Sequence, residues 1–162
     1  MTDAFMTKDD IESIVSYCAE EVHRQGRTPH QVSYMVDAWL DAVQEFPNKK
    51  YPSLEDIQAW GTTIEPESNP YVDGLGYWNS FRAVQVFVGD HVPVRPEFVY
   101  IAMEDWYNRL PELSPEQAYR EFEEIHPFVD GNGRVGKIIF NWLNGSLLSP
   151  EWPPNFWGIF NP

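Results

Sequence analysis

Cysteine, basic residues and long apolar runs are all scarce in this chain of 162 residues. The single cysteine, Cys18, cannot form an internal disulfide or supply a zinc cluster, so we expect a reducing, cytoplasmic location. No apolar run approaches the roughly 20 residues of a membrane-spanning helix. Acidic residues are frequent near the start of the chain, which argues against a secretory signal there.

The balance of charge is strongly acidic. Eleven Lys and Arg residues stand against 25 Asp and Glu residues, giving a net charge of −14. Such a surface repels phosphate backbones and anionic lipids, so we expect neither nucleic acid nor a membrane as a partner. Hydrophobic residues still make up 43% of the chain, enough for a core. The length favours a single domain over residues 1–162.

Apolar residues recur at helical spacing through much of the chain, which predicts a mainly α fold. N-terminal helices are expected at residues 9–25, 29–46 and 53–60. Gly26 should end the first of these, Thr28 should cap the second with Pro29 at its first position, and Gly61 should stop the third. The stretch of residues 62–80, rich in Pro, Gly, Ser and Asn, is expected to be a loop.

The second half of the chain begins with a different pattern. Valine and phenylalanine flank Gly89 and Asp90, which predicts a short β-hairpin at about residues 84–94. Helices are then expected from about residue 96 to 110, from a capping box that starts at Ser114 to residue 125, and over 134–143. The aromatic, proline-rich tail of residues 146–162 is expected to pack on the body.

Residues 126–137 carry the most informative pattern, His-Pro-Phe-Val-Asp-Gly-Asn-Gly-Arg-Val-Gly-Lys. His126 ends one helical pattern, where a neutral imidazole can accept a proton from an attacking hydroxyl. Asp130 stands just before the glycine turn and can hold a magnesium ion that bridges phosphate oxygens. Gly131 and Gly133 allow the backbone to turn tightly and to approach an anion closely. The set indicates phosphoryl-group chemistry on a nucleotide.

Three polar residues share one face of the last predicted helix. Arg134, Lys137 and Asn141 follow an i, i+3, i+7 spacing, away from the apolar stripe. Arg134 and Lys137 lie in the first turn, where cations oppose the helix dipole unless an anion occupies the helix N-terminus. A lone histidine at a helix end or a lone Asp-Gly-Asn-Gly turn is ordinarily structural. Their combination with two cations is what favours a nucleotide site.

The stretch from His126 to Arg134 resembles the signature of the Fic (filamentation induced by cAMP) domain family, H-x-F-x-(D/E)-G-N-G-R-x-x-R. The resemblance covers about residues 75–145. It implies an all-helical Fic fold with one short β-hairpin flap. It also implies a protein adenylyltransferase, which transfers AMP from ATP to a hydroxyl side chain of a target protein and uses Mg²⁺.

The resemblance also implies a role for each residue of the motif. His126 would be the general base, and Asp130 would hold Mg²⁺. The catalytic set is expected to be His126, Asp130, Asn132 and Arg134. The nucleotide-binding set, which cradles and clamps the phosphates, is expected to be Gly131, Asn132, Gly133, Arg134, Lys137 and Asn141. The flap at about residues 84–94 would align a target segment by strand addition.

The chain departs from the signature at Lys137, where the family has a second arginine. A lysine keeps the charge but lacks the planar, bidentate clamp. Family members can be silenced by a helix with the motif (S/T)-x-x-x-E-(G/N), whose glutamate pairs with that second arginine. The stretch from Ser16 to Glu20 comes close, but Glu21 occupies the Gly/Asn position. We therefore expect either restraint by a separate antitoxin-like protein or no restraint.

Two other functions remain open. The Doc-like branch of the family phosphorylates its target by binding ATP in reverse, but it departs from the signature inside the Gly-Asn-Gly turn, which is intact here. A non-catalytic binding module would hold a partner with the hairpin and the acidic surface. The intact His126 and Asp130 argue against that second alternative.

Overall fold

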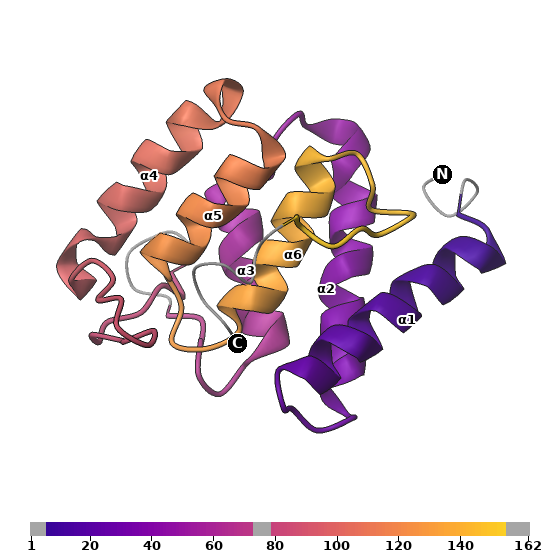
Figure 1. The fold of residues 1–162 in the computed structure, drawn as a ribbon, viewed down its shortest axis with the longest axis horizontal. Helices are drawn as coiled ribbons and strands as arrows, with labels where there is room; N and C mark the ends of the chain where they lie inside the picture. The colour runs from indigo at the N-terminus through magenta and orange to yellow at the C-terminus, as the bar shows by residue number, and fades with distance from the viewer. Residues whose placement is uncertain (1–5, 73–78, 155–162) are drawn as a thin grey trace.

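The fold is built from helices, as a computed structural model of the chain shows for residues 6–72 and 79–154 (Figure 1). The α-helices are α1 (Lys8–Arg24), α2 (Gln31–Glu45), α3 (Leu54–Ile64), α4 (Val99–Arg109), α5 (Pro115–Ile125) and α6 (Asn132–Leu143). The short 3-10 helices are η2 (Phe46–Asn48), η3 (Pro96–Phe98) and η4 (Leu110–Glu112). The predicted mainly α class is confirmed. Across the described ranges, no helix has the length and apolar character needed to span a bilayer.

Helix α6 is the central element. It contacts α2, α3 and α5, while α1 packs on α2 and α4 packs on α5. Figure 1 shows α6 between the α4–α5 pair and the α1–α2 pair. Nearly all of α6 is buried, including Asn132, Arg134, Lys137 and Asn141. Its polar face therefore lies inside the protein, so its charged side chains need partners there.

Four tryptophans with buried side chains anchor loops and neighbouring helices to the core. Each indole N–H donates one hydrogen bond, which removes the cost of burying that group. The acceptors are Leu147 O for Trp39 (2.8 Å), Asp41 Oδ2 for Trp60 (3.0 Å), Ala118 O for Trp106 (3.0 Å) and Lys50 O for Trp142 (3.0 Å).

Three of the α-helices begin at local capping signals in the sequence. Capping boxes begin α1, α3 and α5, and their N-caps are Thr7, Ser53 and Ser114. The start of α2 is different, and the predicted cap is wrong. Residues Thr28 to His30 form a turn before the helix, in which the N–H of Gln31 donates to the carbonyl of Thr28. The helix therefore begins at Gln31 rather than at Pro29.

Gly61 does not stop α3, which continues through it to Ile64. Its role is close packing. A Cβ atom on Gly61 would lie 2.3 Å from Cε1 of Phe128, a distance that real Cβ atoms do not reach. Phe128 belongs to the motif loop and is fully buried. Gly61 thus allows α3 to lie directly against the loop that carries the candidate site.

The segment expected to form a β-hairpin contains a single bridging pair. Val88 and His91 exchange two backbone hydrogen bonds of 3.0 and 2.9 Å around the turn at Gly89 and Asp90. Within the part of the chain that the structure describes, the backbone forms no longer strand. The predicted hairpin at residues 84–94 is therefore wrong in its extent.

Side-chain bonds hold the two legs of the flap (residues 84–94) in place of a strand ladder. Arg82, which is 4% exposed, donates to the carbonyls of Val84 (2.9 Å) and Val94 (2.6 Å). Pro93 has no N–H with which to extend the bridge. One buried guanidinium therefore joins the legs.

The C-terminal tail packs on α1 as far as the structure describes it. Trp152 stacks on Tyr17 with ring centroids 4.0 Å apart, and Pro153 is buried. The remainder of the predicted tail, residues 155–162, lies outside the described residues, as do residues 73–78 of the predicted loop.

We predict that Gly61→Ala lowers the free energy of unfolding by about 1–3 kcal/mol, the usual cost of overpacking, because the added methyl group meets Phe128. Denaturant titration measures it. Without that contact, the same change inside a helix would raise stability by about 0.5–1 kcal/mol. The cost should shrink in a Phe128→Leu background. A stabilised Gly61→Ala variant would contradict the packing role.

Candidate active site

His126 ends α5 in a left-handed backbone conformation, with φ 51° and ψ 63°. This conformation turns the chain sharply into the motif loop. The Nδ1 atom lies 3.2 Å from the carbonyl oxygen of Glu123. Because a carbonyl oxygen only accepts, we assign the proton to Nδ1, which leaves the lone pair on Nε2. Burial lowers the pKa of His126 below its usual 6.5, so the imidazole is neutral near pH 7.

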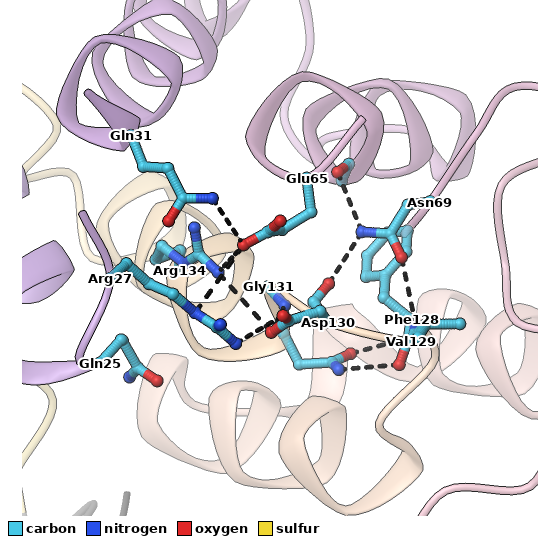
Figure 2. Close-up of polar contacts among 12 residues, drawn as sticks. Gln25, Arg27, Gln31, Glu65, Asn69, Phe128, Val129, Asp130, Gly131 and Arg134 are labelled. Atoms are coloured by element: carbon cyan, nitrogen blue, oxygen red, sulfur yellow. Dashed lines mark hydrogen bonds and ion pairs between the residues drawn. The ribbon is translucent and has the colours of Figure 1, made fainter. Parts of the chain in front are cut away.

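Two buried asparagines hold the motif loop in shape. Asn132 accepts from the N–H of Phe128 and donates to its carbonyl, both at 2.9 Å. Asn69 donates to the carbonyl of Asp130 (2.8 Å) and accepts from the N–H of Val129 (3.2 Å), as Figure 2 shows. The side chain of Asn132 therefore acts on the loop backbone in this structure. The side chain of Asn69 also binds the loop backbone, although Asn69 lies far from the motif in the sequence.

Arg134 and Asp130 lie together, and Glu65 from the end of α3 joins them (Figure 2). Arg134 is 1% exposed, and its Nη2 atom lies 2.6 Å from Glu65 Oε2 and 3.7 Å from Asp130 Oδ1. Asp130 Oδ1 also accepts from the N–H of Gly131 at 2.7 Å. The Nη1 atom of Arg134 is buried and has no hydrogen-bond partner among the described residues. This group is therefore a donor that a bound anion could use.

Two more residues complete this cluster, one at the start of α2 and one in the loop before it. Gln31 donates to Glu65 Oε2 at 3.0 Å. Arg27, in the loop between α1 and α2, places Nη2 2.5 Å from Asp130 Oδ2 and Nε 3.8 Å from Glu65 Oε2. The sequence predictions did not include Glu65, Gln31 or Arg27. They lie far from the motif in sequence, and no local pattern marks them.

Lys137 lies in a second cluster, between α1 and α5. It is 1% exposed, and its Nζ atom lies 3.2 Å from Glu21 Oε2 and 3.1 Å from Tyr119 Oη. Burial lowers the pKa of Lys137 and raises that of the nearby Glu123 to about 7. A nucleotide could reach the Lys137 ammonium only if its contacts with Glu21 and Tyr119 changed.

The glutamate beside Lys137 is Glu21 and not Glu20, which is exposed. Glu21 lies at helical spacing from Ile14 and Cys18 on the buried face of α1. The sequence therefore contained a signal for this contact, namely a carboxylate in phase with apolar residues. The near-match to the inhibitory motif contains the neighbouring Glu20 instead.

Asn141 is fully buried, and its side chain fixes the segment that follows α6. Its Nδ2 atom donates to the carbonyls of Lys137 (2.8 Å) and Glu151 (3.1 Å). Its Oδ1 atom accepts from Ser146 Oγ (2.6 Å) and from the N–H of Glu151 (2.8 Å). A contact between Asn141 and a nucleotide would require some of these bonds to break.

The N-terminus of α6 suits an anion. Its N-cap is Gly131, with φ 85°, and the helix has no side-chain cap bond, so no cap side chain occupies its first N–H groups. Asp130 provides one carboxylate, and the described residues contain no group of three or more His, Cys, Asp or Glu that could hold a metal. Magnesium usually takes one or two carboxylates and completes its shell with water and substrate phosphates. Asp130 therefore fits a magnesium ion that binds together with a nucleotide.

Comparison with family models agrees with the fold and the motif. The model of the Fic/DOC family matches residues 51–144, so the chain belongs to this family. Relatives named protein adenylyltransferase Fic include one from Drosophila mojavensis, 34% identical over 115 residues, and one from Aedes aegypti, 37% identical over 130 residues. These matches cover 65% and 71% of this chain but 21% and 24% of the relatives, so the chain spans about a quarter of their length or less.

Solved structures of the same family confirm the all-helical Fic fold. IbpAFic2 covalently tethered to Cdc42 gives a TM-score of 0.61 at 22% identity, covering 89% of this chain and 48% of that chain. IbpAFic2 in a variant form, in complex with adenylylated Cdc42, gives 0.60 at 20% identity, covering 89% and 48%. A Fic family protein from Desulfovibrio desulfuricans G20 gives 0.52 at 22% identity, covering 87% and 50%.

We predict a pH-dependent loss of stability that originates at Glu123. Its folded-state pKa of about 7 exceeds the usual 4.5, so the folded protein binds this proton more tightly than the unfolded chain does. The resulting stability is present below pH 4.5 and is lost as the pH rises to about 7. Relative to Glu123→Gln, the wild-type free energy of unfolding should fall over this range by on the order of 3 kcal/mol.

Denaturant titrations at a series of pH values measure this difference. Glu124→Gln, which changes the exposed neighbour, is the control and should follow the wild-type curve. Parallel curves for wild type and Glu123→Gln would rule out Glu123 as the origin.

Proposed function

We propose that this chain transfers AMP from ATP to a hydroxyl side chain of a target protein, with His126 as the general base. The contact of Nδ1 with the Glu123 carbonyl carries this proposal, because it leaves Nε2 as the proton acceptor. The lowered pKa of His126 supports it, since a base must be neutral at the working pH. The adenylyltransferase relatives and the complex of IbpAFic2 with adenylylated Cdc42 support it further.

The residues of the site suit the steps of this transfer. His126 Nε2 would accept the hydroxyl proton while the hydroxyl oxygen attacks the α-phosphorus of ATP. The bond from that phosphorus to the oxygen bridging the α- and β-phosphates would break, and pyrophosphate would leave. Arg134 Nη1 and the first N–H groups of α6 would donate to phosphate oxygens as negative charge shifts onto them. Asp130 would hold magnesium, which supplies positive charge to phosphate oxygens when bound.

Contacts between the flap and the end of α5 support a role for the flap in presenting the target hydroxyl to His126. Arg82, which joins its legs, donates to the carbonyl of His126 at 2.7 Å, and His91 Nε2 contacts the carbonyl of Glu124 at 2.8 Å. Phe87 and Val92 on the flap are 69% and 62% exposed. We infer that a target segment pairs with the flap backbone and covers these apolar side chains.

Incubation with ATP labelled at either the α- or the γ-phosphate separates the three candidate functions. AMP transfer moves the α-label onto the target protein, Doc-like phosphorylation moves the γ-label, and a binding module moves neither. We expect α-label transfer, because the Gly-Asn-Gly turn is intact. Transfer of the γ-label, or of no label, would overturn the proposal.

We predict that His126→Ala slows AMP transfer by roughly 10²–10⁴-fold, the usual effect of losing a general base. The wild-type rate should rise with pH through a midpoint below 6.5, because burial lowers the pKa of this group. Transfer assays across pH measure both effects. His23→Ala, at an exposed position on α1, is the control and should match wild type. Near wild-type transfer by His126→Ala would remove its assigned role.

We predict that Phe87→Ala weakens target modification by about tenfold in kcat/KM for the target, because one exposed aromatic side chain loses its apolar contact. ATP binding and the melting temperature should not change, since Phe87 is 69% exposed. Ile101→Ala, which removes another exposed apolar side chain on α4, is the matched control. If the two variants lower kcat/KM for the target equally, a specific flap contact is contradicted.

A further inference from the structure

Arg27 brings a third cation to the candidate site from an unexpected part of the chain, the loop between α1 and α2. Its Nη2 atom lies 2.5 Å from Asp130 Oδ2 (Figure 2). The end of α1 fixes its backbone: Gly26 turns the chain with φ 71°, and the N–H of Arg27 donates to the carbonyl of Val22 at 3.1 Å. The Arg27 side chain is 39% exposed, so, unlike the buried Arg134, it can shift without disturbing the core.

The two oxygens of Asp130 have different partners. Oδ1 accepts from the N–H of Gly131 at 2.7 Å and lies 3.7 Å from Arg134 Nη2. Oδ2 accepts from Arg27, and the hydrogen bonds of the described residues give it no second donor. A carboxylate with 29% of its side chain exposed could offer this oxygen to a metal ion, but Arg27 already holds it.

We propose that Arg27 competes with the divalent cation for the Asp130 carboxylate, so that metal binding displaces the Arg27 side chain. This inference rests on the proposed function, in which Asp130 is the magnesium ligand. Glu65 gives the displaced guanidinium a second anion, because its Oε2 atom lies 3.8 Å from Arg27 Nε. Arg27 can therefore leave Asp130 without losing all of its electrostatic stabilisation.

This competition favours a metal ion that arrives with a nucleotide over a metal ion alone. A lone cation gains one carboxylate and must break a charge-assisted hydrogen bond. A cation bound to triphosphate brings negative charge as well, which can pair with the cations that remain, including the free Nη1 of Arg134. The ion pair between Arg27 and Asp130 thus lowers metal loading of the nucleotide-free protein.

Manganese binding to the whole chain without nucleotide tests this competition directly. Water-proton relaxation measures the binding. Asp130→Asn in each background identifies the part of the binding that depends on Asp130. In Arg27→Gln, this part should tighten by about tenfold relative to wild type, since one charge-assisted hydrogen bond no longer opposes the metal. Unfolding curves check that each variant keeps its fold.

Two further variants separate a local effect from a general one. Arg95→Gln removes the same charge at an exposed position and should change Asp130-dependent binding less than twofold. Arg27→Lys keeps the charge at the site and should stay close to wild type. The proposal is overturned if Arg27→Gln tightens binding no more than Arg95→Gln does, or if Arg27→Lys binds as tightly as Arg27→Gln.

A second measurement tests the assumption that Asp130 is a ligand of the metal ion. Manganese binding is repeated with an ATP analogue that cannot be cleaved between the α- and β-phosphates. If Asp130→Asn weakens this binding, the metal site is supported, and the Arg27 variants then decide the competition. If Asp130→Asn has no effect, the metal site in the proposed function fails, and the competition fails with it.

Discussion

Two buried cations on α6 constrain the rest of the molecule. Arg134 and Lys137 lie near the start of the central helix and are each 1% exposed, so each needs an anion within the protein. Glu65 at the end of α3 supplies one, and Glu21 on α1 supplies the other. Segments far apart in the sequence are thereby held at the end of α6 where the phosphates of a nucleotide would bind.

The two ion pairs differ in whether the cation keeps a donor for a phosphate. Arg134 is oriented by Glu65 through Nη2 and keeps a buried Nη1 without a hydrogen-bond partner in the described part of the chain, so a phosphate that reaches Nη1 does not have to displace Glu65. Lys137 is enclosed by Glu21 and Tyr119 and can meet a phosphate only after these contacts change. The lysine in place of the second arginine of the signature therefore serves a packed ion pair in this structure.

Sequence patterns were sufficient for features that depend on neighbouring residues. Periodicity and capping boxes predicted most helices, and the spacing from His126 to Arg134 predicted the candidate site. Contacts across the fold were not predictable in this way. Glu65, Asn69 and Arg27 meet the motif only through packing, and Gly61 contacts Phe128 only because α3 lies against the loop. The flap was overpredicted because apolar alternation does not show that side-chain bonds would replace strand pairing.

A crystal structure with magnesium and an ATP analogue that cannot be cleaved between the α- and β-phosphates tests the central claim most directly. The account predicts phosphate oxygens at the N-terminus of α6, within hydrogen-bond distance of Arg134 Nη1, and the α-phosphorus on the side of His126 Nε2. A nucleotide bound elsewhere would contradict the assignment of the site. A γ-phosphate at His126 would contradict AMP transfer.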